Sequence, residues 1–248
     1  MRTLVLSDIH ANLEALQCIL NQEKNNYDLL ISLGDIVGYG PYPNECVEII
    51  ASEAAVSLAG NHDLGVCGKI DTEVFSHTAK KSLEWTRSVI TDQNMHYLDS
   101  LESSIIEYRG VLLSHGSPES PVWGYIFSQA DAGFAFTSAD FTLSFFGHTH
   151  VPSVFSRTPS TGDQAGLTSA GAGEDKMVLE TREPGLRMMI NPGSAGFPRD
   201  KKNRLNQDYS RSGTQYGLFD FDTRVWQFRE LRYDMNKTIE IMSSHGLW

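Results

Sequence analysis

Residues 4–10 read Leu-Val-Leu-Ser-Asp-Ile-His, an apolar run that ends abruptly in polar residues. The run from Thr3 to Leu6 is short and aliphatic, so it predicts a buried β-strand. Asp8 and His10 follow just beyond the end of that strand. In an extended tip, residues two apart point to the same side, and a carboxylate and an imidazole could bind one ion together. Taken alone, the pair is better explained as a helix cap and a surface histidine.

The pattern of strand, polar tip and helix recurs along the first part of the chain. Helical spacing starts after Asn12, a suitable N-cap, and again over Pro43–Ala51. Leu29–Leu33 and Ala55–Ala59 predict two further buried strands. This alternation predicts an α/β domain whose functional residues lie at the carboxyl ends of its strands.

The second half of the chain shows a different pattern of apolar residues. Residues 72–101 carry spaced apolar positions that predict one or two helices, and short apolar runs typical of strands follow them. Residues 156–186 are rich in Gly, Ser and Thr, which predicts a loop or hairpin insertion, and residues 203–212 predict a second polar loop. We therefore expect residues 1–248 to form a single domain. The later predicted strands are Ile105–Ile106, Val111–Leu113, Leu143–Phe146, Met188–Ile190, Tyr216–Phe221 and Val225–Leu231.

The composition restricts the classes of function. A formal net charge of −11 argues against an extended nucleic-acid-binding surface, which needs clustered Lys and Arg. No apolar run approaches the length of a membrane span, and the first run meets Asp8 too early for a signal peptide. The three cysteines form no Cys-x-x-Cys pair, as expected for free thiols in a reducing compartment. We expect a cytoplasmic protein with no membrane partner, and the oligomeric state stays open.

Five segments at predicted strand ends carry side chains that commonly bind metals, and five of the eight histidines fall in them. Each segment has an ordinary alternative, such as a turn built by Gly, Asn and Asp, or a solvated loop histidine. However, His-x-His is a common metal-ligand arrangement, and the ordinary alternatives would have to hold five times independently. The segments are Asp8-Ile9-His10, Gly34-Asp35, Gly60-Asn61-His62-Asp63, Ser114-His115-Gly116 and Gly147-His148-Thr149-His150.

This ordered set of motifs resembles that of the calcineurin-like metallophosphoesterase family. The match runs from residue 4 to residue 150 without a missing motif. The later segments Asn191-Pro192-Gly193-Ser194 and Pro198-Arg199-Asp200 are similar to the small bacterial and archaeal branch described as diadenosine tetraphosphatase-like. The resemblance implies an α/β (α+β) fold, a four-layer α-β-β-α sandwich of two mixed sheets.

The resemblance also implies a role for each motif residue. Asp35 would bridge two divalent metal ions, and His62 would be the catalytic histidine. A hydroxide between the ions would attack phosphorus, and His62 would protonate the leaving oxygen or stabilise its charge. Mixed oxygen and nitrogen ligands suit Mn, our first choice, as well as Fe, Ni, Co or Zn. By resemblance, Asp8, His10 and His150 hold the first ion with Asp35, and Asn61, His115 and His148 hold the second.

One departure concerns the protein phosphatases of the same superfamily, which carry Gly-Asp-x-Val-Asp-Arg-Gly. In this chain Gly38 stands where they have the Asp that orients the catalytic histidine, and Tyr39 stands where they have a phosphate-contacting Arg. Asp63 is a candidate to orient His62 instead. Arg199 is a candidate phosphate contact, because a guanidinium matches phosphate geometry, although a solvated loop residue is an equal alternative.

We expect a small phosphate-ester substrate. A phosphodiesterase acting on small nucleotide-type compounds comes first, a phosphomonoesterase second and a dinucleoside polyphosphate hydrolase third. Tyr39 and Trp123 could stack a base, although core packing is an equal alternative for both. The rival from another class is a non-catalytic scaffold of the same fold. The histidine at position 62 argues against it, because the scaffold subunit of this fold lacks one there.

Overall fold

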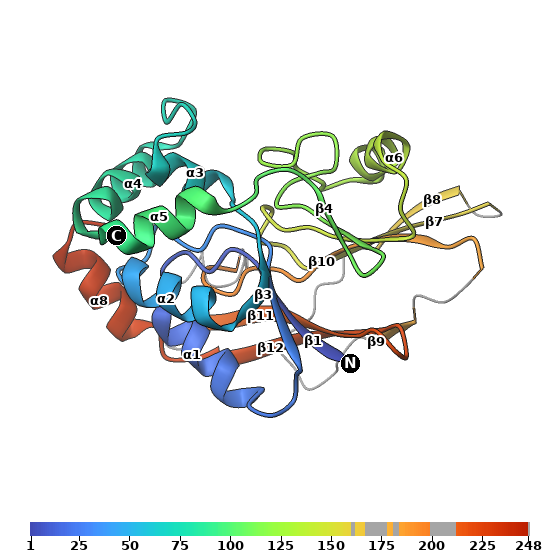
Figure 1. The fold of residues 1–248 in the computed structure, drawn as a ribbon, viewed down its shortest axis with the longest axis horizontal. Coiled ribbons are helices and arrows are strands. Elements are labelled where there is room, and N and C mark those ends of the chain that lie inside the picture. Colours follow the sequence, from blue (N-terminus) through green and yellow to red (C-terminus); the bar gives the residue numbers. More distant parts are fainter. Residues whose placement is uncertain (160–161, 167–177, 181–183, 199–211, 248) are drawn as a thin grey trace.

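A computed structural model describes residues 1–159, 162–166, 178–180, 184–198 and 212–247 (Figure 1). These residues form two mixed sheets of six strands each. The first has the order β3-β2-β1-β11-β12-β9, and the second has the order β4-β5-β6-β10-β7-β8. The strands of the first sheet are β1 (Arg2–Leu6), β2 (Leu29–Ser32), β3 (Ala54–Ser57), β9 (Val178–Glu180), β11 (Ser212–Asp220) and β12 (Val225–Tyr233). Those of the second are β4 (Ile106–Tyr108), β5 (Val111–Leu113), β6 (Leu143–Phe145), β7 (Ser153–Thr158), β8 (Gly162–Gly166) and β10 (Arg187–Asn191).

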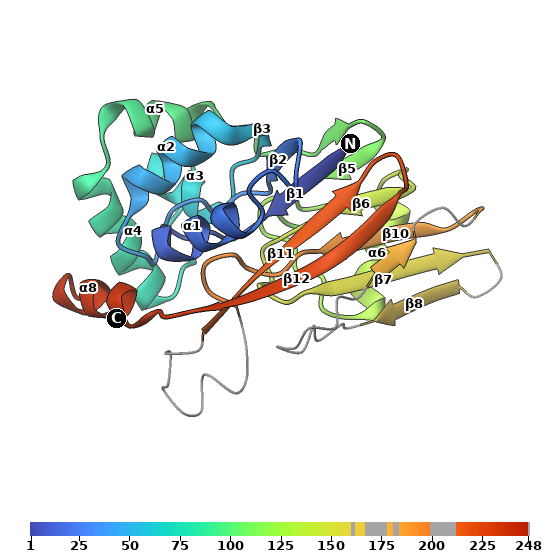
Figure 2. The same ribbon diagram turned by 90° about the horizontal axis from the view of Figure 1, so that it is seen from below.

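Helices cover the outer faces of the two sheets. In Figure 1, α6 lies above the second sheet, and α1 and α2 lie to the left of the strands of the first. The other helices gather at one end of the molecule, away from α6 (Figure 2). The described helices are α1 (Leu13–Gln22), α2 (Pro43–Glu53), α3 (Asn61–Cys67), α4 (His77–Val89), α5 (Asp92–Ser100), α6 (Gln129–Ser138) and α8 (Asn236–Ser244).

Side chains alternate between the two faces of each strand, and the apolar ones form three separate cores. Leu4 and Leu6 face α1 and α2, whereas Val5 faces the second sheet, because side chains of a strand alternate between its faces. Phe145 and Trp226 fill the core between the sheets, with ring centroids 4.7 Å apart. A third core lies between the second sheet and α6. Three cores between four layers confirm the expected α-β-β-α sandwich.

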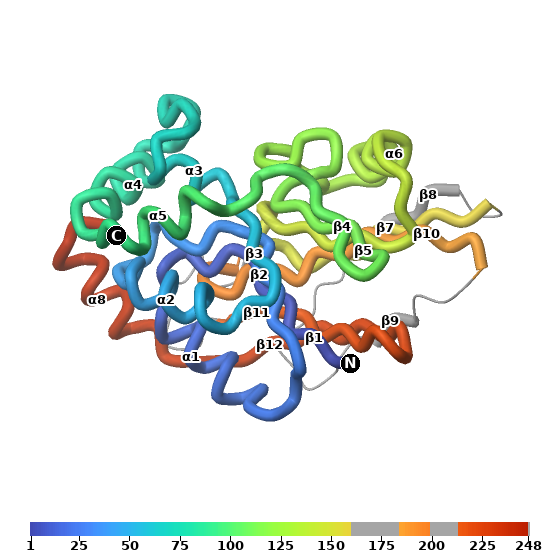
Figure 3. Tube along the Cα trace, in the orientation of Figure 1, coloured from blue at the N-terminus to red at the C-terminus, as the bar shows by residue number. Residues whose placement is uncertain are grey.

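Parallel strands bring the polar tips together. Strands β1, β2 and β3 run parallel, as do β5, β6 and β10. Strand β11 pairs antiparallel with β1, so residues from both ends of the chain share one sheet (Figure 3). Since carboxyl ends of parallel strands meet at one edge of a sheet, the tips of β1, β2, β5 and β6 converge.

Most predicted elements are confirmed, with small shifts at their ends. Residues 72–101 form two helices, α4 and α5, and Asn12 caps α1 by accepting the Ala15 N–H at 3.2 Å. The predicted strand Ala55–Ala59 ends earlier, at Ser57. Within residues 156–186, β7 and β8 form an antiparallel hairpin. Residues 160–161, 167–177 and 181–183 lie outside the described residues, as does the second polar loop apart from Ser212.

Three helices were not predicted from the sequence. No helix was expected at α3, because its first segment, Gly60-Asn61-His62-Asp63, suits a turn as well as the start of a helix. Helix α6 buries Phe136 but exposes Phe134, which weakens its apolar periodicity. Helix α8 is short and largely polar, with Thr238 and Met242 as its buried residues. Each of these helices is stabilised by tertiary packing rather than by a strong local pattern.

Phe145→Ala is expected to lower the free energy of unfolding by about 3–5 kcal/mol, the usual cost of a large core truncation. The ring is fully buried between Phe219 and Trp226. Urea unfolding followed by circular dichroism measures the change. Phe134→Ala on the exposed face of α6 is the matched control, expected to stay within about 0.5 kcal/mol. Equal losses in both variants would contradict the position of the inter-sheet core.

Candidate metal centre

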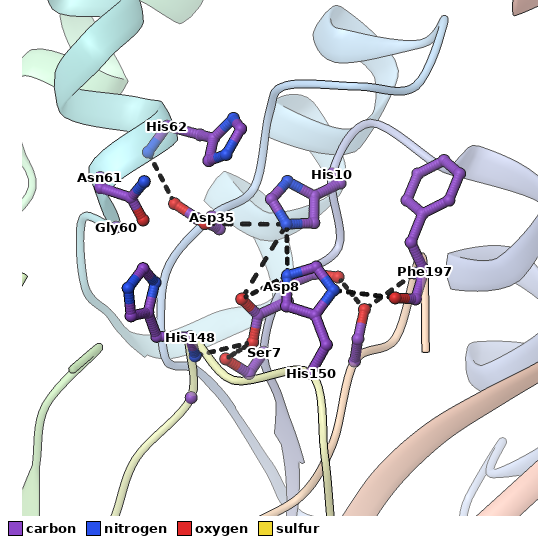
Figure 4. Close-up of polar contacts among 12 residues, drawn as sticks. Ser7, Asp8, His10, Asp35, Gly60, Asn61, His62, His148, His150 and Phe197 are labelled. Carbon is purple, nitrogen blue, oxygen red and sulfur yellow. Dashed lines mark hydrogen bonds and ion pairs between the residues drawn. The ribbon is translucent and has the colours of Figure 1, made fainter. Parts of the chain in front are cut away.

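The predicted ligands converge at the tips of four strands and at the start of α3, and Figure 4 labels all of them except His115. Asp8 and His10 follow β1, and Asp35 follows β2. His115 follows β5, the pair His148 and His150 follows β6, and Asn61 and His62 begin α3. All eight side chains are buried, none of them more than 7% exposed. The chain therefore places two carboxylates and five imidazoles in one region with little access to water.

The backbone at these tips is unusual. Asp8, His10, Asp35, His148 and His150 all have φ between 51° and 65°. Residues with a side chain rarely adopt this left-handed conformation. It persists where the surroundings enforce it, and it is most frequent at functional sites. The sharp tips direct side chains of neighbouring loops into the same space.

Three of the imidazoles are oriented in the same way. The Nδ1 atom lies 3.1 Å from the Val37 carbonyl oxygen in His10, 2.9 Å from that of Leu33 in His115, and 2.8 Å from that of Phe197 in His150. A carbonyl can only accept, so each Nδ1 carries the proton and donates it. In the neutral form of each ring, Nε2 then presents a lone pair, the arrangement typical of metal-bound histidine.

The Nε2 atoms of His10 and His150 face each other at 3.0 Å. Because both Nδ1 atoms already carry protons, two lone pairs oppose one another, and a cation between them removes the repulsion. Asp8 supplies a third ligand atom. Its Oδ2 accepts from the Ser7 hydroxyl at 2.6 Å and the His148 N–H at 3.1 Å. Its Oδ1 is buried without a hydrogen-bond partner, 3.3 Å from His150 Nε2.

A second set of ligands shares Asp35 with the first. Asp35 Oδ2 lies 3.7 Å from His10 Nε2 and 3.5 Å from His115 Nε2, so one oxygen lies between the two sets. Its Oδ1 accepts the backbone N–H of His62 at 2.8 Å. Asn61 Oδ1 approaches His115 Nε2 at 3.2 Å, and the buried Nε2 of His148 has no hydrogen-bond partner. These donors fit two adjacent cations.

The pKa values of the buried side chains favour protonation states that can bind cations. Burial lowers the pKa of His10 well below its ordinary value and that of His148 to about 3, so both rings are neutral. Burial alone would raise the pKa of Asp35, but His115 and its other histidine neighbours hold it well below the usual range. Burial opposes a charge on His115, yet the Asp35 carboxylate raises its pKa to about 9. A metal ion would displace that proton.

Asp63 does not orient His62, which corrects the sequence-based suggestion. Its carboxylate accepts from the backbone N–H groups of Ile36, Val37 and Gly60, each at 3.0 Å. It therefore fastens the loop after β2 to the start of α3. Burial, together with the charge of Asp35, raises the pKa of Asp63 to about 7.

The ring of His62 occupies the space above Gly38. Gly38 has φ +90°, and a Cβ atom there would lie 2.3 Å from His62 Nδ1. That nitrogen is buried and has no hydrogen-bond partner among the described residues. An Asp at position 38, as in the protein phosphatases, is therefore incompatible with this position of the ring. Burial lowers the pKa of His62 to about 4, so the ring is neutral at pH 7.

The two predicted substrate contacts differ in outcome. Tyr39 lies at the site, with its ring centroid 4.8 Å from that of His10 and 4.6 Å from that of His62. Arg199 lies outside the described residues, two positions after Phe197, whose carbonyl oxygen accepts from His150.

A cavity of about 180 Å³ opens beside the cluster. Asp35, Asn61, His148 and His150 line one side, and Tyr39, Phe75, Trp123 and Tyr125 line much of the rest. Tyr39 and Trp123 were expected here from the sequence, whereas Phe75 and Tyr125 were not. Phe75 precedes α4 in an ordinary helical pattern, so nothing local distinguishes it. Tyr125 could have been noted because its loop follows the predicted ligand His115.

The sequence and the fold of this chain are similar to those of known proteins. The sequence model of the calcineurin-like phosphoesterases matches residues 1–152. An uncharacterized protein of Methanocaldococcus jannaschii is 37% identical over 241 residues, covering 95% of this chain and 89% of that protein. A crystal structure of a metallophosphoesterase from Sphaerobacter thermophilus superposes with a TM-score of 0.80 at 34% identity, covering 100% of this chain and 95% of that one.

A shorter match involves a nucleotide hydrolase. A symmetrical bis(5′-nucleosyl)-tetraphosphatase of Psychromonas ingrahamii is 38% identical over 68 residues, 26% of this chain and 25% of that protein. The part of the chain that the structure describes contains no helix long and apolar enough to cross a membrane.

Asp35→Asn is expected to weaken the binding of both metal ions, whereas Asp8→Asn should weaken one. The reason is that Asp35 Oδ2 lies between the two sets of candidate ligands, while among the described residues the histidines paired with Asp8 Oδ1 are His10 and His150. The same change of charge is made at both positions, so the comparison isolates the bridging position. Elemental analysis after dialysis against limiting Mn gives the metal content per chain. Near-full occupancy of both sites in Asp35→Asn would contradict the bridging role.

Proposed function

The chain belongs to the calcineurin-like phosphoesterase family, and from this premise we propose that it is a metal-dependent phosphodiesterase of small nucleotide-type compounds. The observation that carries the proposal is the facing pair of Nε2 atoms in His10 and His150, 3.0 Å apart beside the unpartnered Oδ1 of Asp8. This arrangement is satisfied by a cation, and the cavity beside it has room for an ester.

The protein residues hold and orient the reacting groups. Two divalent ions, when bound, would supply a nucleophile at neutral pH and neutralise charge on the phosphoryl oxygens. The Ser7 hydroxyl and the His148 N–H fix the Asp8 carboxylate. The carbonyl groups of Val37, Leu33 and Phe197 fix the tautomers of three histidines. Mixed oxygen and nitrogen ligands suit Mn, Fe, Ni, Co or Zn, and Mn remains our first choice by resemblance to the small bacterial branch of the family.

His62 acts on the leaving group in this proposal. Its backbone N–H is bonded to Asp35, so the side chain lies next to the bridging carboxylate without being needed to hold it. Because the ring is neutral at pH 7, donation of a ring N–H to the leaving oxygen is favoured over transfer of a proton from an imidazolium. The role is thus stabilisation of developing charge, the second of the two options that the sequence leaves open.

The lining of the cavity favours a diester over a monoester. Among the described lining residues there is no Lys or Arg. A monoester dianion would gain from such a cation, whereas a diester carries a single negative charge that metal ions could balance. A phosphomonoesterase is therefore the second candidate. A dinucleoside polyphosphate hydrolase is third, supported by the short match to the tetraphosphatase.

Chelation is expected to abolish hydrolysis, and Mn is expected to restore it. Removing cations should also lower the melting temperature, because the ions bind the folded form alone. Rates with bis(p-nitrophenyl) phosphate and p-nitrophenyl phosphate, before and after EDTA and dialysis, test the activity and the preference for diesters. Undiminished turnover in metal-free protein, or an unchanged melting temperature, would rule out the metal-dependent reaction. Faster hydrolysis of the monoester would favour the phosphomonoesterase.

His62→Asn is expected to reduce kcat by about 10²–10³-fold, comparable to removing one donor to a developing oxyanion. Both metal ions should stay bound, since the His62 N–H that bonds Asp35 belongs to the backbone. The loss should be larger for an alkoxide than for p-nitrophenolate, which leaves well without a donor. Metal content and rates on both ester types are measured in one preparation. Loss of one ion, with equal rescue of both esters at high Mn, would show that His62 holds Asn61 instead.

A further inference from the structure

Besides Tyr39, three aromatic residues line the cavity. We call Phe75, Trp123 and Tyr125 the aromatic arc. The ring centroids of Phe75 and Trp123 lie 5.2 Å apart in an edge-to-face arrangement. Phe75 in turn contacts His62 at 5.1 Å, and Tyr125 lies over His148 at 4.0 Å. The arc therefore extends from the proposed catalytic histidine to a predicted metal ligand.

The arc is held in place before any substrate arrives. Trp123 and Tyr125 lie on the loop that follows His115, and this loop folds back on itself. The Gly116 N–H donates to the Pro121 carbonyl at 2.5 Å, and the Gly124 N–H donates to that of Ser120 at 2.8 Å. A Cβ atom at Gly124 would lie 1.8 Å from the Ser117 hydroxyl, so only glycine allows this close approach.

The rings remain accessible despite these constraints. Tyr125 is 45% exposed, and Phe75 and Trp123 are half-buried. Accessible aromatic rings offer stacking surface to a bound ligand. Because the candidate metal ligands line the same cavity, a group that packs on these rings can belong to the molecule whose phosphate lies at the metal ligands.

We propose that the aromatic arc is the subsite that stacks a nucleobase of the substrate. The proposal rests on the phosphodiesterase function and specifies its substrate class. Stacking on an aromatic ring needs no charge, which agrees with the absence of Lys and Arg from the described lining. The cavity of about 180 Å³ is smaller than the roughly 300–1,000 Å³ of pockets that enclose drug-sized ligands. It therefore encloses one base next to the reacting phosphate, rather than two nucleosides.

Two ligands with the same phosphate group test the subsite directly. Adenosine 5′-monophosphate and ribose 5-phosphate differ by the base alone, and isothermal titration calorimetry on the Mn-loaded protein gives both dissociation constants. We expect the nucleotide to bind roughly 5- to 150-fold more tightly, the range expected for stacking one base. Trp123→Leu and Tyr125→Leu should each reduce this ratio at least about fivefold, because each removes a stacking surface.

Matched substitutions elsewhere separate stacking from a general loss of structure. Trp85→Leu on α4 and Phe134→Leu on α6 alter aromatic residues that do not line the cavity, and the ratio should stay unchanged. Melting temperatures identify any variant that is unfolded. If one of the two arc variants is unfolded, the ratio of dissociation constants in the other one tests the subsite. A wild-type ratio near one, or equal ratios in arc and control variants, would overturn the subsite.

Different experimental outcomes contradict the base-stacking subsite and the proposed function. Failure to hydrolyse bis(p-nitrophenyl) phosphate in the presence of Mn would contradict the phosphodiesterase while leaving the ratio of dissociation constants measurable. Hydrolysis of that ester together with a ratio near one would retain the phosphodiesterase and overturn the base-stacking subsite alone.

Discussion

The structure depends on a group of buried candidate ligand atoms that repel one another when no positive charge lies between them. His10 and His150 direct lone pairs at each other across 3.0 Å, and Asp8 and Asp35 add carboxylates that are hardly exposed. Such groups are unfavourable together in a low-dielectric interior unless positive charge balances them. The fold maintains the opposition by fixing each ligand from outside, through a carbonyl group, a hydroxyl or a backbone N–H. The predicted metal ions would thus be part of the folding free energy as well as the chemistry.

Hydrogen bonds between the loops that follow β1 and β2 hold the candidate ligands in these positions. The Asp8 N–H donates to the Gly34 carbonyl at 3.0 Å, and the His10 N–H donates to the Asp35 carbonyl at 2.9 Å. Asp63 then links the same loop to the start of α3 through three backbone N–H groups. These cross-links enforce the left-handed backbone conformations, which cost free energy at residues other than glycine. The rigid sheets below supply the fixed strand ends from which the loops extend.

The sequence predicts most of the fold, because the fold depends on local patterns. Apolar runs followed by Asp8, Asp35 or His148 identify the strands, and the structure brings the candidate ligands at their ends together. Helix α6 was missed, because its stability comes from packing of Phe136 against the second sheet. The role of Asp63 could not be predicted either. A turn aspartate can accept from many neighbours, and only the folded chain shows that Ile36, Val37 and Gly60 are the donors. The aromatic arc joins residues from separate segments that no sequence spacing relates.

Gly38 connects the ligand cluster to the aromatic side of the cavity. In the protein phosphatases the corresponding position carries an Asp, and in this chain the missing side chain leaves room for the ring of His62. The ring packs against Gly38 and contacts both Tyr39 and Phe75, with ring centroids 4.6 Å and 5.1 Å away. A histidine oriented by packing on aromatic rings keeps a low pKa, whereas one paired with a carboxylate would have a raised pKa. With Gly at position 38, His62 is a neutral ring, and the side chains that pack on it are aromatic. Both features suit an ester whose organic group is planar and whose phosphate carries a single charge.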